Sequence, residues 1–177
     1  QCAQRRSGPL GLGDVHGEIR NRRLHLLCAI GLVSSEIERL GVDGRLSVLG
    51  TVPPQHVYGL ESTVLMAMQG GCALHAGRPF YPADIRAALE ALPRPRGLVT
   101  TPVHLRVLLA ETEPLPPADF LLSATAPLSP QLAAAAEARF AAPLYEIYGC
   151  TEAGQIASRR TVETDEWRVL RGLMLRT

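Results

Sequence analysis

The sequence contains no lysine, because all 18 of its basic residues are arginines. This absence excludes any mechanism that uses a lysine of this chain, such as a Schiff base or a phosphate-loop lysine. The 17 acidic residues almost balance the arginines, so the formal net charge is +1. A non-specific nucleic-acid binder normally carries a basic excess, and we therefore expect no nucleic-acid partner.

Paired cysteines and long apolar runs are also absent. The 4 cysteines are scattered along the chain, and no Cys-x-x-Cys pair occurs. This spacing predicts neither a zinc site nor a disulfide framework, and it favours a reducing, cytoplasmic setting. The longest apolar run, residues 24–33, is shorter than the roughly 20 residues that cross a bilayer, so we expect no membrane span.

The two ends of the chain suggest a fragment of a longer protein. The sequence starts with Gln1 rather than Met, and it stops at Thr177 within an expected strand. We interpret residues 1–45 as a divergent N-terminal segment, whose first part, residues 1–33, comes from a shifted reading frame or unrelated sequence. Apolar spacing nevertheless predicts a helix over residues 24–40.

From residue 46 onward, short apolar strands alternate with helices of about ten residues. We expect strands at residues 46–52, 72–75, 97–100, 120–122 and 144–147, and helices at 60–69, 83–92, from 101 onward and at 131–140. This alternation predicts an α/β fold with a mostly parallel sheet and flanking helices over residues 46–154. Residues 155–177 read as the start of a truncated β-rich segment, with a few antiparallel strands.

Polar groups follow several of the predicted strands, and ligands of open α/β sheets bind beyond the carboxyl ends of strands. The richest such segment is residues 148–154. Its Tyr148 offers a flat ring for stacking, Thr151 a hydroxyl for a phosphate oxygen, and Glu152 a hard oxygen ligand for magnesium. This combination indicates a nucleotide site.

Residues 148–152, Tyr-Gly-Cys-Thr-Glu, resemble the YGxTE motif of the adenylate-forming enzymes. These include acyl-CoA synthetases, aryl-acid ligases and peptide-synthetase adenylation domains. Residues 54–59 resemble the family's P-x-H-x-x-G-type segment, residues 97–102 its next strand, and residues 123–128 its GGAPL loop. The resemblance covers about residues 46–176 and is nearest to the ligases of aryl-polyene or xanthomonadin-type pigment synthesis.

The resemblance implies a function and a set of site residues. The implied function is that of an ATP-dependent acid–thiol ligase, which activates a carboxylic acid as an acyl-adenylate and transfers it to a thiol of coenzyme A or a carrier protein. ATP, Mg²⁺ and coenzyme A are the implied cofactors. The implied catalytic residues are Thr151 and Glu152, with Glu152 holding magnesium. The implied nucleotide contacts are Ala124, Thr125, Ala126, Tyr148, Gly149 and Thr151, and the implied substrate pocket contains His56, Tyr58 and Gly59.

The chain also departs from the family pattern. At the place of the family's Ser/Thr-rich phosphate loop with its lysine, residues 5–13 have glycines but no lysine. The family's ribose-binding aspartate and C-terminal subdomain would follow residue 177. We therefore expect this chain to be inactive as it stands.

Two questions stay open at this stage. The absence of a charged residue near His56 and Tyr58 fits an aromatic or an aliphatic acid, without choosing between them. The alternative function is that of a non-catalytic remnant, acting as a binding or interaction module. An esterase is disfavoured because no G-x-S-x-G motif occurs.

Overall fold

The structure is a computed structural model that describes residues 31–41 and 44–171. Of the helix predicted over residues 24–40, the described part is helical from residue 31 to residue 40. Gly41 follows with a φ of +63°, a left-handed conformation that suits a glycine at a helix end. The remainder of this prediction, and residues 5–13, lie outside the described residues.

Within the described residues, one sheet has the strand order β2-β1-β3-β4-β5-β6-β7. The strands are β1 (Ser47–Gly50), β2 (Ala73–Leu74), β3 (Arg96–Thr100), β4 (Phe120–Ser123), β5 (Leu144–Cys150), β6 (Gly154–Arg159) and β7 (Arg168–Val169). Every pair from β2 to β5 is parallel, whereas β6 and β7 join antiparallel. The predicted fold class, a mostly parallel sheet with antiparallel strands at the C-terminal end, is confirmed.

The predicted helices are also present, and side-chain caps start three of them. They are α2 (Val57–Gly59), the π-helical η1 (Leu60–Leu65), α3 (Met66–Gly70), α4 (Pro82–Ala91), α5 (Pro102–Ala110) and α6 (Pro130–Phe140). Thr101 and Ser129 accept backbone hydrogen bonds as N-caps of α5 and α6. The helix expected at 60–69 begins earlier, at Val57, because His56 caps it.

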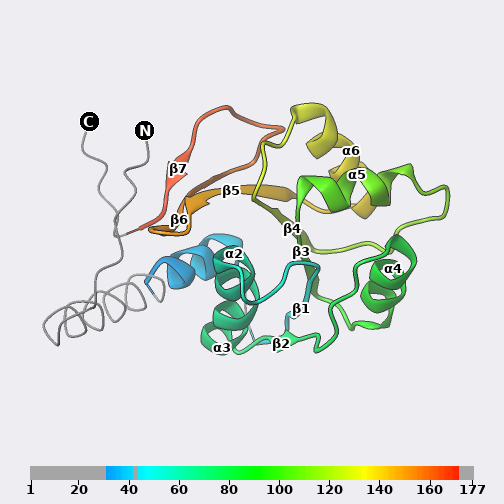
Figure 1. Ribbon diagram of the computed structural model, residues 1–177, viewed down its shortest axis with the longest axis horizontal. Helices are drawn as coiled ribbons and strands as arrows, with labels where there is room; N and C mark the ends of the chain where they lie inside the picture. Colours follow the sequence, from blue (N-terminus) through cyan, green and yellow to red (C-terminus); the bar gives the residue numbers. More distant parts are fainter. Residues whose placement is uncertain (1–30, 42–43, 172–177) are drawn as a thin grey trace, which may run out of the picture.

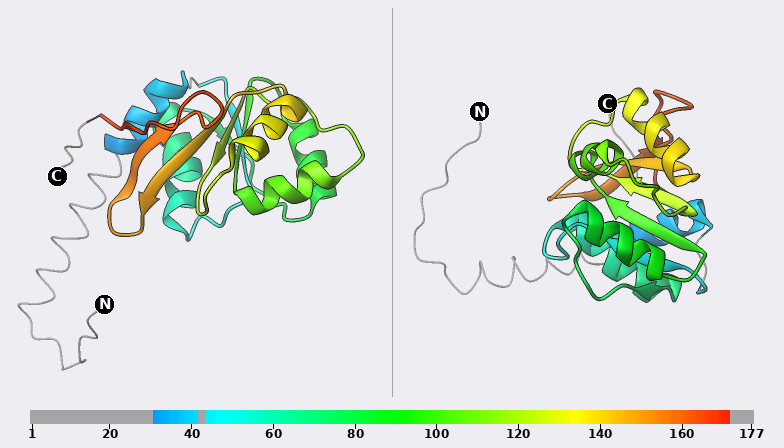
Figure 2. Two further views of the ribbon diagram at one scale, coloured as in Figure 1. Left: turned by 90° about the horizontal axis from the view of Figure 1, so that it is seen from above. Right: turned by 90° about the vertical axis from the view of Figure 1, so that its right-hand side faces the viewer.

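Helices cover both faces of the sheet (Figures 1 and 2). On one face, α4, α5 and α6 bury residues such as Leu49, Leu98 and Leu121. On the other face, the helix over residues 31–40 and the stretch from α2 to α3 bury Val48 and Val99. Because successive strand residues point to opposite faces, adjacent apolar residues serve both cores. Within residues 31–41 and 44–171, none of the helices combines the length and apolar character needed to cross a membrane.

Strand β6 continues the sheet beyond residue 154. The antiparallel pairing with β5 runs from Glu146 opposite Arg159 to Cys150 opposite Gly154. Its register shifts between Tyr148 and Gly149. The division of the chain into segments 1–45, 46–154 and 155–177 stays a prediction. In the described part, however, the last two segments share one sheet.

Glu146 is the main polar link between the central strands and this antiparallel extension. Its carboxylate is buried and accepts hydrogen bonds from the Leu128 backbone N–H (2.9 Å), the Arg159 Nε (2.8 Å) and the Thr161 hydroxyl (2.9 Å). Several donors, one of them charged, offset the cost of burying the carboxylate. Glu146 therefore connects the segment after β4 to β5 and β6.

We predict that Glu146→Gln lowers the free energy of unfolding by about 3 kcal/mol, because the substitution leaves the Arg159 charge without its buried partner. Urea denaturation followed by circular dichroism measures this change. The control Glu163→Gln removes an exposed partner of Arg160 and should change stability by less than about 1 kcal/mol. Equal losses of stability in the two variants would contradict the role of Glu146 as the main polar link.

Candidate functional site

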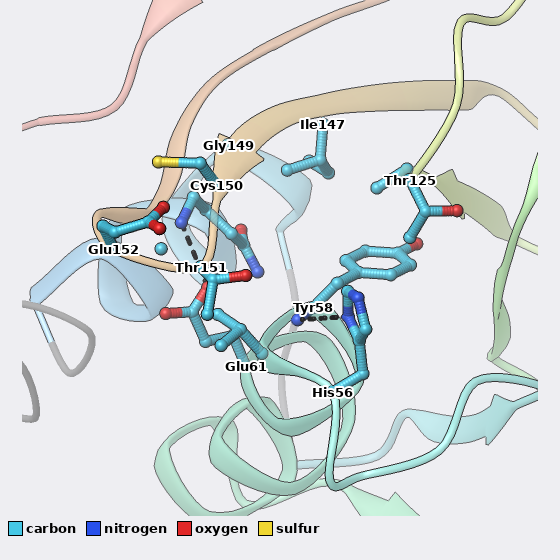
Figure 3. Close-up of a pocket in the computed structure, with 13 residues that line it drawn as sticks. His56, Tyr58, Glu61, Thr125, Ile147, Gly149, Cys150, Thr151 and Glu152 are labelled. Carbon is cyan, nitrogen blue, oxygen red and sulfur yellow. Dashed lines mark hydrogen bonds between the residues drawn. The ribbon is translucent and has the colours of Figure 1, made fainter. Parts of the chain in front are cut away.

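A cavity of about 300 Å³ lies at the carboxyl ends of β1, β4 and β5 (Figure 3). Its lining consists of His56, Val57, Tyr58, Glu61, Ala124, Thr125, Ile147, Gly149, Cys150, Thr151, Glu152, Gly154 and Gln155. These residues come from three separate parts of the chain. The fold thus brings together the segments that the sequence analysis selected after β1, β4 and β5.

Seven of the predicted site residues line the cavity, and three do not. Those that line it are His56, Tyr58, Ala124, Thr125, Gly149, Thr151 and Glu152. Gly59, Ala126 and Tyr148 lie outside the lining. Packing requires a glycine at position 59, because a Cβ there would lie 2.2 Å from the Pro53 carbonyl oxygen. The functional roles of all ten residues stay predictions.

Tyr148 points away from the cavity because side chains alternate along β5, and both Ile147 and Gly149 line the cavity. Its ring is 55% exposed and lies 5.4 Å from the Trp167 ring, centroid to centroid. The Arg159 guanidinium lies 4.4 Å from the Trp167 centroid. Tyr148 and Trp167 therefore form an exposed aromatic surface next to the end of β5.

His56 has a defined orientation at the mouth of the cavity. It is the N-cap of α2, and its Nδ1 accepts a hydrogen bond from the Tyr58 backbone N–H at 3.3 Å. Because Nδ1 is an acceptor, the neutral ring carries its proton on Nε2. His56 is exposed, so this N–H can serve a ligand.

Glu61 is a cavity residue that the sequence analysis missed. It is buried, and its Oε2 accepts the Gln155 backbone N–H at 3.1 Å. Burial raises its pKa from an ordinary value of 4.5 to about 7. The expectation that no charged residue lies near His56 and Tyr58 is therefore wrong. Glu61 lies on the helix predicted over residues 60–69, but Tyr58 precedes that predicted helix, so the sequence pattern placed no charged side chain beside Tyr58.

The turn from β5 to β6 closes tightly over Glu61. Gly154 has a φ of +70°, and a Cβ there would lie 2.4 Å from Glu61 Oε1. The positive φ favours glycine, and a larger residue would also require the Glu61 carboxyl to move. The conformation of the turn that contains Thr151 and Glu152 thus depends on a residue of η1.

A second buried carboxyl, that of Glu36, lies on the helix over residues 31–40. Neither of its oxygens has a hydrogen-bond partner among the described residues, although the Gln155 amide lies close enough to lower its pKa. Burial is the larger effect and, together with the nearby Glu61, raises the pKa to about 8. The Tyr58 Oη and the Gln155 Oε1 are likewise enclosed without a partner within the described residues.

Thr125 carries backbone strain at the edge of the cavity. Its φ is +77°, in the left-handed region that β-branched residues avoid. The residue lies two positions after the end of β4, on the segment that Glu146 anchors at Leu128. The strain thus occurs where the chain must turn to line the cavity.

The profile of the AMP-binding enzyme family matches residues 22–173. The chain belongs to this family. The match includes part of the segment that we interpreted as divergent. No curated protein sequence matches the chain.

Solved structures of AMP-binding enzymes have the same fold. A benzoate CoA ligase from Burkholderia xenovorans is 21% identical with a TM-score of 0.64, over 75% of this chain and 29% of that chain. ATP-bound MatB from Rhodopseudomonas palustris is 17% identical with a TM-score of 0.65, over 80% of this chain and 28% of that chain. The N-terminal domain of FACL13 from Mycobacterium tuberculosis is 18% identical with a TM-score of 0.66, over 77% of this chain and 35% of that chain. The chain thus spans about a third or less of these proteins.

We predict that the chain becomes less stable as the pH rises from about 5 to about 8. In the unfolded chain Glu36 ionises near pH 4.5, but in the folded chain only at about pH 8. Because the pKa of Glu36 is higher in the folded chain, the folded state holds this proton more tightly. The stability that this provides below pH 4.5 is lost as the pH rises from 4.5 to about 8. We expect a loss on the order of 1 kcal/mol per pH unit from this group.

Thermal or urea denaturation at several pH values measures this effect, and Glu36→Gln is the matched variant. Because all other groups are unchanged, the difference between the two proteins isolates Glu36. The variant should be the more stable protein at pH 8 and similar to the wild type at pH 5. A constant difference at all pH values would contradict the prediction.

We also predict that Thr125→Gly raises the free energy of unfolding by about 1 kcal/mol, because glycine adopts a positive φ without strain. Ala141→Gly is the matched control, since Ala141 has a φ of +51° at the end of α6, outside the cavity lining. Both variants should gain stability in urea denaturation. A Thr125→Gly protein less stable than the wild type would rule out strain at this position.

Proposed function

We propose that this chain forms the acid pocket and the phosphate-binding turn of an ATP-dependent acid–thiol ligase. Such an enzyme activates a carboxylic acid as an acyl-adenylate and passes the acyl group to a thiol of coenzyme A or a carrier protein. The observation that carries the proposal is the meeting of residues 56–61, 124–125 and 147–155 around one cavity. Membership of the AMP-binding family supports it.

The geometry of β5 suggests where each part of an acyl-adenylate binds. The cavity, with apolar Ala124 and Ile147 in its wall, suits the tail of the acid. The exposed Tyr148 ring, which points away from the cavity, suits stacking of the adenine base. Thr151, in the turn between these two places, suits the phosphate. One ligand would therefore cross the end of β5.

The proposed reaction has two steps. A carboxylate oxygen of the acid attacks the α-phosphorus of ATP, and the bond to pyrophosphate breaks. A thiol then attacks the acyl carbon, and AMP leaves. In this proposal the His56 Nε2–H donates a hydrogen bond to the carboxylate, and the Thr151 hydroxyl donates one to the α-phosphate. The support is that both residues line the cavity and that His56 Nδ1 is already an acceptor. Donors of this kind stabilise charge that develops during phosphoryl and acyl transfer.

Glu152 is the proposed magnesium ligand. No cluster of three or more His, Cys, Asp or Glu side chains that could hold a metal occurs in the described part of the chain. A single exposed carboxylate is nevertheless sufficient, because Mg²⁺ is commonly bound by one or two carboxylates together with phosphates and waters. Glu152 would hold the ion, and bound magnesium would supply positive charge that neutralises the phosphate oxygens.

We further propose that this chain binds an acyl-adenylate but does not turn over substrate. It spans 29% of the benzoate CoA ligase and 28% of ATP-bound MatB, so most of such an enzyme is not represented. It also has no lysine to place on a phosphate. Binding is therefore the informative property to measure.

The proposal is tested by titrating the chain with a non-hydrolysable benzoyl-adenylate mimic, in which a sulfamate replaces the phosphate. Trp167 is the only tryptophan and lies beside Tyr148, so its fluorescence should change when a base stacks there. We expect saturable quenching that magnesium strengthens. Glu152→Ala should weaken binding about tenfold in magnesium and have no effect without it.

Glu90→Ala is the matched control, because it removes the same charge from an exposed position of α4. This variant should bind like the wild type in both buffers. Absence of quenching in a sample whose circular dichroism shows it to be folded would overturn the proposal and favour the non-catalytic alternative. Equal effects of the two substitutions would overturn the role of Glu152.

A further inference from the structure

The inner wall of the cavity has an unusual charge distribution. Two of its lining residues, Glu61 and Glu152, are acidic, and none is an arginine. Glu152 is exposed in the turn after β5, whereas Glu61 is buried beneath that turn. In Figure 3 Glu61 comes up from the helix at the base of the site, and His56 and Tyr58 lie to its side.

The carboxyl of Glu61 retains acceptor capacity toward the cavity. Its hydrogen bond within the described residues is the one from the Gln155 backbone N–H to Oε2. The side-chain amide of Gln155 is engaged elsewhere, because its Nε2 donates to the Ser62 hydroxyl at 2.8 Å. A carboxylate has about four acceptor positions, so a ligand that brings a donor would satisfy a group that the protein leaves partly unpaired.

The surroundings of Glu61 favour a neutral donor and disfavour an anion. No ion pair involves Glu61 in the described part of the chain, and the nearby Glu36 is a second acidic group. A ligand carboxylate placed here would be desolvated beside another carboxyl without a compensating cation. A hydroxyl would instead donate to Glu61 at little electrostatic cost.

We propose that Glu61 determines the acid specificity of this site: it accepts a hydrogen bond from a hydroxyl on the tail of a monocarboxylic acid and rejects a tail that ends in a second carboxylate. This inference rests on the proposed function, because it requires that the cavity holds the acid. It identifies the substrate class as hydroxylated monocarboxylic acids.

The competing interpretation is that Glu61 only supports the turn, through its contacts with Gly154 and Gln155. That role predicts equal losses for every ligand when Glu61 is changed. The proposed role predicts a change in the ratio between ligands. Glu61→Gln separates the two, because glutamine has nearly the same shape and keeps an oxygen for the Gln155 N–H, but it has no charge.

The test uses the 177-residue chain and a set of acyl-adenylate mimics with matched tails. The tails are benzoyl, and benzoyl with a hydroxyl, a methyl or a carboxylate at position 3 or 4. A hydroxyl and a methyl group have similar sizes, so the ratio of the dissociation constants of these two mimics reports the hydrogen bond to Glu61. Binding is measured at pH 8, above the pKa of about 7, where Glu61 is mostly ionised.

At one of the two positions, we expect the hydroxyl tail to bind about tenfold more tightly than the methyl tail, and the carboxylate tail at least about tenfold more weakly. Glu61→Gln should bring the carboxylate tail to within about threefold of the methyl tail. Glu90→Gln is the control: it makes the same chemical change at an exposed position of α4, outside the cavity lining, and should leave both ratios unchanged.

Each outcome decides one question. If all wild-type tails bind equally, or if Glu61→Gln weakens all tails by the same factor, the specificity role of Glu61 is overturned while the proposed function stands. If no mimic binds to the folded chain, the proposed function fails and the specificity proposal fails with it. Circular dichroism and thermal denaturation establish that each variant is folded.

Discussion

The buried carboxylate of Glu146 is the interaction on which the site depends most. It accepts hydrogen bonds from the segment after β4 and from β6, while its own backbone lies in β5. Those three segments also contribute Thr125, the 150–154 turn and Gln155 to the cavity. A single charged group therefore fixes the relative positions of the walls. Its burial is tolerated because three donors, one of them the charged Arg159 of β6, satisfy the carboxylate oxygens.

Departures from local preference concentrate around this cavity. Thr125 has a positive φ, and the carboxyls of Glu36 and Glu61 are buried with no ion pair to a cation among residues 31–41 and 44–171. In contrast, the core under α4, α5 and α6 is formed by apolar side chains. Strained or under-paired groups persist only where the surrounding structure holds them in place, and they commonly mark functional sites. Their coincidence with the family motifs is an independent argument for the proposed site.

Much of the fold could be predicted because its signals are local. Proline after Thr101 and Ser129 marks the starts of α5 and α6, and short apolar runs mark the strands. The meeting of three motif segments followed from the rule for parallel strand ends. Glu61 was missed because its partner, Gln155, lies 94 residues away and no local pattern indicates that contact. The orientation of Tyr148 follows from side-chain alternation along β5, but which face of this strand meets the cavity is set by segments distant in the sequence.

The distribution of charge also explains why binding and turnover should be separable in this chain. Of the described residues that line the cavity, none is an arginine, and the acidic ones are Glu61 and Glu152. Such a lining can accept hydrogen bonds from a tail and can orient a metal ion, but it cannot neutralise a triphosphate. Transfer of a phosphoryl group requires positive charge placed in advance around its oxygens. Under the proposed function, the acid tail and the base would therefore be the parts of the ligand that this chain recognises, and the charge needed for reaction would come from outside the cavity lining.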